Sequence, residues 1–186
     1  GGGSAAALEG ALGAALTAMV CALTVGKKKY ADVQELAIES QKKGNELKAQ
    51  FVDVIDRDTE AFNAVSAVFA MPKDTDEEKA ARKAAMQEAL KGCTKTPFEM
   101  MELACQALEL TRSVVGKLNA SAASDLGCAA LSLKAAIQGA WLNVLINIGG
   151  IQDQAFADEY RQKGQALLDK ALPLADAIYQ EVLESL

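Results

Sequence analysis

Very little in this sequence can stop a helix. Its 186 residues contain only three prolines, Pro72, Pro97 and Pro173, and they are rich in Ala, Leu, Glu, Lys and Gln, which are strong helix formers. No segment alternates apolar and polar residues between turn signals, as a strand would. The length suits one hydrophobic core. We therefore expect an all-α fold, in which residues 1–186 form a single-domain bundle of long antiparallel helices.

Apolar positions recur at helical spacing along most of the chain. We expect Ser4 and Ser124 to be N-caps, Gly92 to close one helix and Pro97 to begin the next. Pro173 should kink or split the last helix. The expected helices are Ser4–Val25, Tyr30–Met71, Lys73–Lys91, Thr96–Leu118, Ser124–Gly149 and Gln154–Leu186.

Two of these segments, Ser4–Val25 and Ser124–Gly149, are apolar on nearly every side. Each is long enough to cross a bilayer. The first is rich in Ala and Gly and runs into GKKKY, however, and the second contains Lys134 and Gln138. We interpret both as helices buried in a bundle. Because such helices must be covered on all sides, and one bundle of this size struggles to enclose both, we expect a homodimer. Small residues form one ridge of the first helix, which lets a neighbouring backbone approach closely: Gly10, Ala14, Ala18 and Ala22.

Composition limits the chemistry that this chain can perform. The net charge is −6, which argues against a nucleic-acid partner. The chain has no histidine, so the commonest general base and metal ligand are both missing. Acid–base chemistry must use Asp, Glu, Lys, Tyr or water, and we expect no metal. The four cysteines form no CxxC pair, and we expect reduced thiols, mostly in the core, in a cytoplasmic protein.

The segment Ser124–Gly149 carries the most informative polar residues. At about 100° per residue, Asp125 and Asn143 point in nearly the same direction, and Asn147 lies about 40° further round. Two interpretations remain open. The asparagines either cross-link helices while Asp125 caps the helix beside Ser124, or they form a polar stripe that faces a cleft. Asp125 and Asn143 are about 27 Å apart along the axis, so only an elongated ligand or a partner subunit would bring them into one site.

Other candidate binding residues lie near the start of the chain. The run Gly1–Ser4 at a helix start could meet an anion through backbone amides. The lysines Lys27–Lys29 either complement a helix dipole or form a carboxylate-binding patch. Asp58 and Asn63 flank Phe62 in an acidic segment, most of which we expect to be an exposed face.

Taken in order, several segments resemble one known family. They are GGGSAAALEGALGAAL followed by GKKKY, DTEAFNAV at 58–65, TPFEMMELACQALEL, SDLGCAAL and GAWLNVLINIGGIQD. Their ordered combination is similar to the formiminotetrahydrofolate cyclodeaminase and methenyltetrahydrofolate cyclohydrolase family. The resemblance implies an all-helical homodimer with a tetrahydrofolate derivative held in a cleft. That family usually has one more helix before the glycine run, so we expect residues before Gly1 in the natural protein.

The resemblance implies one of two reactions at the carbon between N5 and N10. We favour the cyclodeaminase, a step of histidine degradation that gives 5,10-methenyltetrahydrofolate and ammonia; the alternative is the cyclohydrolase, which gives 10-formyltetrahydrofolate. Neither needs a metal or a covalent nucleophile. A non-catalytic helical scaffold is the rival from another class. Asp125 becomes the catalytic acid–base candidate, with Asp58 next in line. The implied folate-binding residues are Ser4, Lys28, Lys29, Asp58, Asn63, Ser124, Asn143 and Asn147.

Overall fold

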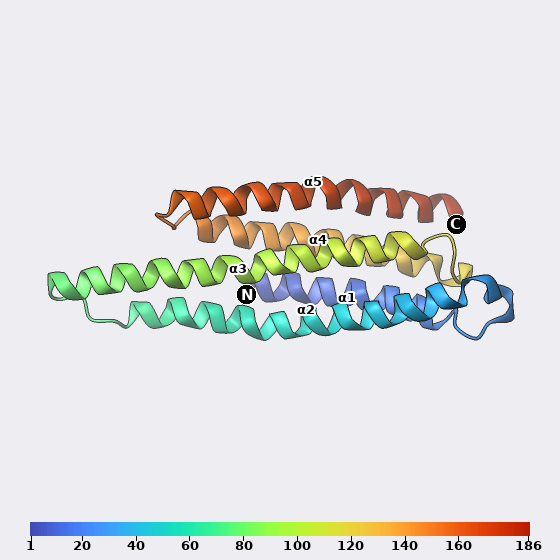
Figure 1. The fold of residues 1–186 in the computed structure, drawn as a ribbon, viewed down its shortest axis with the longest axis horizontal. Coiled ribbons are helices and arrows are strands. Elements are labelled where there is room, and N and C mark those ends of the chain that lie inside the picture. Colours follow the sequence, from blue (N-terminus) through green and yellow to red (C-terminus); the bar gives the residue numbers. More distant parts are fainter.

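The computed structural model describes residues 1–186 as one bundle of long helices without strands, which confirms the all-α prediction. Helices α2 and α3 form a hairpin whose closed end extends past the other helices, while α1 lies beside it and α5 lies on the far side of α4 (Figure 1). Two short 3₁₀ segments, η1 (Lys28–Val33) and η2 (Ala120–Ala122), precede α2 and α4. The long helices are α1 (Gly2–Ala22), α2 (Gln34–Phe69), α3 (Asp76–Val114), α4 (Ala123–Ile148) and α5 (Gln154–Ser185).

Helix α1 packs against α2, α3 and α4, and small residues make this possible. Gly10 lies against the ring of Phe51, and Gly13 lies against Leu133 of α4. An added Cβ at Gly10 or Gly13 would overlap these side chains. Of the predicted ridge, Gly10, Ala14 and Ala18 are buried where neighbouring helices approach α1, whereas Ala22 is exposed.

The prediction that Gly92 and Pro97 separate two helices is wrong, because both lie inside α3. Proline has no N–H to donate to the carbonyl four residues earlier, which leaves the carbonyl of Cys93 without its helical partner. The side chain of Asn147 on α4 donates to that carbonyl at 2.9 Å. A hydrogen bond from another helix thus lets α3 continue through Pro97.

Pro173 likewise lies inside α5 and does not split it. Pro173 and Asp169, whose carbonyl loses its helical partner, are both exposed, so water can reach that carbonyl.

The expected N-caps are wrong too: α1 has Gly1 as N-cap and α4 has Ala122, with no side-chain cap at either. In α1, the hydroxyl of Ser4 is used for a contact with another helix instead.

The second helix begins at Gln34 rather than at Tyr30. Tyr30 has a non-helical backbone, with φ −115° and ψ 30°. The amide of Gln34 donates to the carbonyls of Tyr30 at 2.8 Å and Thr24 at 3.2 Å, and its oxygen accepts from the N–H of Gly26 at 2.7 Å. One side chain therefore holds the turn between α1 and α2.

By length and composition, Gly2–Ala22 and Ala120–Ile148 could each span a bilayer. Core helices of a bundle have the same composition, and these two pack against one another. The interpretation that both are bundle helices and that the protein lies outside the membrane stays a prediction.

All four cysteines are free, and three of them are buried, namely Cys21, Cys93 and Cys105.

Gly10→Ala tests the packing of α1, and Gly92→Ala in α3 is its control. Both positions are inside helices, where alanine is favoured by about 1 kcal/mol. The Cβ added by Gly92→Ala contacts no other atom, so this variant should raise the free energy of unfolding by about that amount. Gly10→Ala must displace Phe51 and should lower it by about 1–3 kcal/mol. Urea unfolding at one protein concentration measures both, and a shift of the same sign in the two variants would contradict the packing described here.

Candidate functional site

A cleft of about 480 Å³ opens beside the start of α1. Its walls come from the first turn of α1, the second half of α2, the middle of α3 and the last turns of α4. Four of the predicted binding residues line it. The lining residues are Gly1, Gly2, Gly3, Ser4, Asp58, Thr59, Phe62, Leu90, Cys93, Asn143, Ile146 and Asn147.

Asp58 is the only ionisable carboxylate in the cleft, and the start of α1 holds it in place. The hydroxyl of Ser4 donates to its Oδ2 at 2.9 Å. Gly3 lies so close to the carboxylate that an added Cβ would overlap it. The first N–H groups of α1 have no intrahelical acceptor, so the positive end of the helix dipole faces this anion. The half-buried Asp58 keeps its Oδ1 free of hydrogen bonds from the protein.

Asn147 and Asn143 combine parts of the two interpretations left open by the sequence. Asp125 fits neither, because it neither caps α4 nor lines the cleft. The amide of Asn147 donates to the carbonyls of Asn143 at 2.8 Å and of Cys93 at 2.9 Å, so it cross-links α4 to α3. The amide of Asn143 donates to the carbonyl of Gly139 at 2.8 Å. Both side chains also line the cleft, and their amide oxygens accept no hydrogen bond from the protein. Each can therefore accept one from a ligand.

Apolar surface completes the cleft. Phe62 is 64% exposed and Ile146 is 75% exposed, so both offer contact area to a flat ring. Cys93 is a buried thiol that donates to the carbonyl of Ala61 at 3.1 Å. Burial raises the pKa of the Cys93 thiol, and the charge of Asp58 raises it further. The thiol therefore stays protonated at neutral pH and is a poor nucleophile.

The other predicted site residues lie elsewhere. Lys28 and Lys29 are exposed in η1, beyond the far end of α1, which is about 30 Å long. Asp125 is half-buried in the first turn of α4, and Ser124 beside it is exposed. Asn63 is exposed on α2, outside the cleft lining. Within one chain the structure does not bring these five residues to the cleft.

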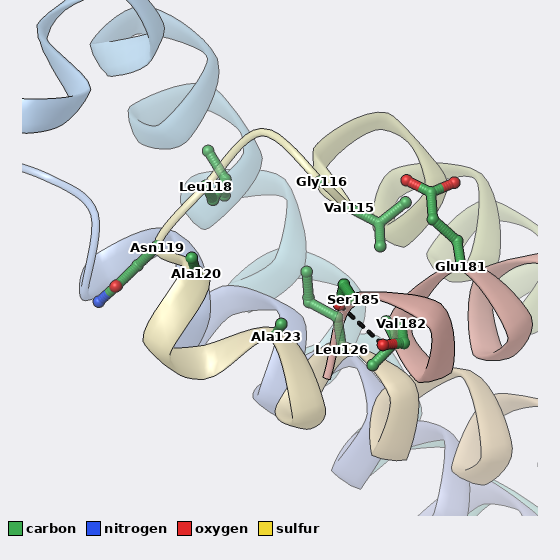
Figure 2. A pocket seen from close by; sticks show the side chains of 10 residues that line it. All are labelled: Val115, Gly116, Leu118, Asn119, Ala120, Ala123, Leu126, Glu181, Val182 and Ser185. Carbon is green, nitrogen blue, oxygen red and sulfur yellow. Dashed lines mark hydrogen bonds between the residues drawn. The ribbon is translucent and has the colours of Figure 1, made fainter.

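A second cavity, of about 200 Å³, lies at the opposite end of the bundle, between the starts of η2 and α4 and the ends of α3 and α5 (Figure 2). Its walls are mainly apolar. Its one carboxylate, Glu181, forms an ion pair with Arg112, and the hydroxyl of Ser185 donates to the carbonyl of Val182 at 2.7 Å. Asp125 does not line it. The cleft at the start of α1 is therefore the better candidate for a reaction site.

Sequence reasoning named Ser4, Asp58, Asn143 and Asn147 but missed other residues of the cleft. Gly3 was named only as part of the run Gly1–Ser4, and it lies against the carboxylate of Asp58. Cys93, whose thiol pKa is raised by burial and by the charge of Asp58, was not named as a site residue. The glycine run was a signal for Gly3, because it permits close approach of another chain segment. Nothing in the spacing of Cys93 indicates that it lies near residue 58.

The profile of the family described as formiminotransferase-cyclodeaminase matches residues 1–166 of this chain. The chain belongs to the formiminotransferase-cyclodeaminase family. This confirms the resemblance inferred from the ordered motifs. The relatives that follow are named as enzymes, so membership of an enzyme family is also confirmed.

Three relatives of this formiminotransferase-cyclodeaminase family member are informative. The chain is 43% identical over 182 residues to a methenyltetrahydrofolate cyclohydrolase of Methylorubrum extorquens, covering 98% of this chain and 88% of that one. It is 33% identical over 171 residues to the formimidoyltransferase-cyclodeaminase of Rattus norvegicus, covering 92% of this chain but only 32% of that one. The crystal structure of a formiminotetrahydrofolate cyclodeaminase from Thermotoga maritima matches with a TM-score of 0.80 at 27% identity, over 100% of this chain and 87% of that one.

Proposed function

We propose that this chain opens 5,10-methenyltetrahydrofolate to 10-formyltetrahydrofolate, with Asp58 as its acid–base group. The observation that carries the proposal is a single carboxylate, fixed by Ser4 with one oxygen free, in a cleft that also offers amide acceptors and an exposed ring. The 43% identity to a relative named as a cyclohydrolase, over nearly the whole of both chains, supports this reaction. For this reason we place it ahead of the deamination that the sequence interpretation favoured.

The proposed chemistry uses Asp58 twice. The methenyl bridge carries a positive charge, which the carboxylate attracts. Water adds to the bridging carbon while Oδ1 of Asp58 accepts its proton, which gives a neutral tetrahedral carbon. The bond from this carbon to N5 then breaks, the protonated carboxyl can return the proton to N5, and the formyl group stays on N10. The hydroxyl proton of the tetrahedral carbon leaves as the carbonyl forms, so the net reaction consumes one water and releases one proton.

The remaining lining residues suit the binding of a folate. Phe62 and Ile146 provide contact surface for the fused rings. The free amide oxygens of Asn143 and Asn147 can accept hydrogen bonds from ring N–H and amino groups. Cys93 remains a neutral thiol and supplies no competing nucleophile. The set requires neither a metal nor a covalent intermediate, and a metal-free mechanism stays a prediction.

Cyclodeamination is the second candidate, since it passes through a tetrahedral carbon at the same position. There N10 attacks the formimino carbon on N5, and the leaving nitrogen needs a proton to depart as ammonia. The relatives named as cyclodeaminases, in Rattus norvegicus and Thermotoga maritima, support this reading. The chain spans about a third of the length of the rat protein, so nothing is inferred about transferase chemistry.

Asp58→Asn tests the acid–base assignment. The kcat should fall by roughly 10²–10⁴, the usual effect of losing a general acid–base group. Decay of methenyl absorbance measures the hydrolase, and ammonia release from 5-formiminotetrahydrofolate measures the deaminase. Asp56→Asn, which changes an exposed carboxylate on the same helix, is the matched control and should stay within about twofold of the parent. Near-normal turnover by folded Asp58→Asn would remove Asp58 from the mechanism.

We further propose that the chain forms a homodimer through α1 and α4. Neighbouring, antiparallel stripes of exposed apolar side chains run along both helices, which pack together. Leu142 and Ile146 are 67% and 75% exposed. A patch of this kind on a single chain indicates an interface, and a second copy offers the same apolar surface in return. The stripes comprise Leu8, Leu12, Met19 and Leu23 on α1 and Leu131, Leu142 and Ile146 on α4.

A charge placed in these stripes should prevent dimerisation. We expect Leu12→Glu combined with Leu142→Glu to be a monomer at micromolar concentration, because each dimer would bury four unpaired carboxylates. Leu183→Glu, at an equally exposed leucine of α5, should remain a dimer. Light scattering after gel filtration measures the mass. A parent protein that is monomeric and active would refute the interface.

Asp125 keeps its predicted catalytic role only if it reaches the cleft of a partner subunit, because it lies about 27 Å from Asn143 along its own helix. A two-fold axis across α1 and α4 that sets the two copies antiparallel would place it there. In that case, co-expressed Asp58→Asn and Asp125→Asn chains should recover about a quarter of parental activity through mixed dimers, although each alone is inactive. Normal activity of Asp125→Asn alone would show that Asp125 is not catalytic.

The roles of Lys28, Lys29, Asn63 and Ser124 and the cytoplasmic location likewise stay predictions.

A further inference from the structure

Pro97 lies in the middle of α3, where a proline costs the helix a hydrogen bond. The residue is buried and does not line the cleft, whereas Cys93, one turn earlier, does. The other proline inside a helix, Pro173, is exposed on α5. Pro97 can therefore influence the cleft only through the backbone or through other side chains.

The side-chain amide of Asn147 has two N–H groups, and both are used inside the protein. They donate to the carbonyls of Asn143 at 2.8 Å and of Cys93 at 2.9 Å. If the amide were rotated by half a turn, its oxygen would face two carbonyl oxygens, which have no proton to donate. The two bonds therefore fix the orientation of the amide, and the atom that Asn147 offers to a ligand in the cleft is its oxygen.

Asn143, one turn earlier on α4, lacks the second anchor. Its amide donates to the carbonyl of Gly139 at 2.8 Å and to no carbonyl of another helix. The difference arises at Pro97, because the carbonyl of Cys93 would otherwise accept the N–H of residue 97 along α3. Proline has no N–H, and its ring crowds the carbonyl four residues earlier, so this carbonyl is open to a donor from α4.

We propose that Pro97 is a positioning residue for the cleft, which acts through the carbonyl of Cys93 and the amide of Asn147. The inference rests on the proposed function for the identity of the ligand. The hydrogen bond that lets α3 continue through Pro97 also holds the amide oxygen of Asn147 in place as an acceptor. An acceptor held in this way selects N–H groups, such as those of the ring and amino group of a folate, and disfavours a carbonyl at the same place.

Pro97→Ala tests this role. Residue 97 then has an N–H that competes for the carbonyl of Cys93, so the amide of Asn147 is held less firmly. The KM for 5,10-methenyltetrahydrofolate should rise by about threefold to tenfold, the effect of weakening one hydrogen bond to a ligand. The kcat should stay within about twofold, because Asp58 is not affected. Pro173→Ala is the matched control, since it removes the proline of α5, and its KM should stay within about twofold of the parent.

A double variant shows whether Pro97 acts through Asn147. Asn147→Ala alone should raise the KM at least as much as Pro97→Ala, because it removes the acceptor itself. If the proline acts through this amide, adding Pro97→Ala to Asn147→Ala should raise the KM no further. An equal further rise in both backgrounds would mean that Pro97 shapes the cleft by another route, and would overturn the proposal. An unchanged KM in Pro97→Ala would overturn it as well.

Hydrogen exchange of the Asn147 side-chain amide, followed by NMR, separates this proposal from the proposed function, since it needs no folate. The resonance is identified by its absence from the spectrum of Asn147→Ala. Exchange should be slow in the parent and in Pro173→Ala, and about threefold to tenfold faster in Pro97→Ala, where one of the two hydrogen bonds is weakened. Faster exchange in a protein that converts no folate would refute the proposed function but support the control of Asn147 by Pro97. Equal exchange in all three proteins would refute the proposal, even if the chain is an active cyclohydrolase.

Discussion

The close approach of α1 to its neighbours is the constraint on which the rest of this structure depends. Gly10 admits the ring of Phe51 and Gly13 admits Leu133, and larger residues at these positions would force the helices apart. The same close packing continues to the first turn of α1, where Gly3 lies against the carboxylate of Asp58. Core and candidate site therefore share one physical cause, because the small residues that let the helices meet also bring a helix start next to an acid.

The resulting site concentrates its chemistry in few groups. The chain has no histidine, and the cleft contains one carboxylate, Asp58, which is held in place by the hydroxyl of Ser4 and by the start of α1. The thiol of Cys93 stays protonated, and the asparagines combine a structural amide bond with a free oxygen. These groups suit proton transfer at a one-carbon unit.

Much of this could be predicted from local sequence. Helical periodicity and the shortage of prolines indicated an all-α bundle, and the ordered motifs indicated the family. They also indicated Ser4, Asp58, Asn143 and Asn147, which the fold brings together. The ends of helices were harder, because caps and breaks depend on competing partners. Ser4, a good N-cap by residue type, bonds to Asp58 from another helix instead.

The sequence by itself determined the helical class, the apolar faces and the ridge of small residues on α1, because these follow from residue type and a period of 3.6. Only the tertiary structure decided which residues share a cleft and whether α3 continues. Pro97 frees the carbonyl of Cys93, and local rules then favour a break. Asn147, 54 residues away, satisfies that carbonyl and keeps the helix intact. Such a bond is invisible in the sequence, because it exists only after α3 and α4 have packed together.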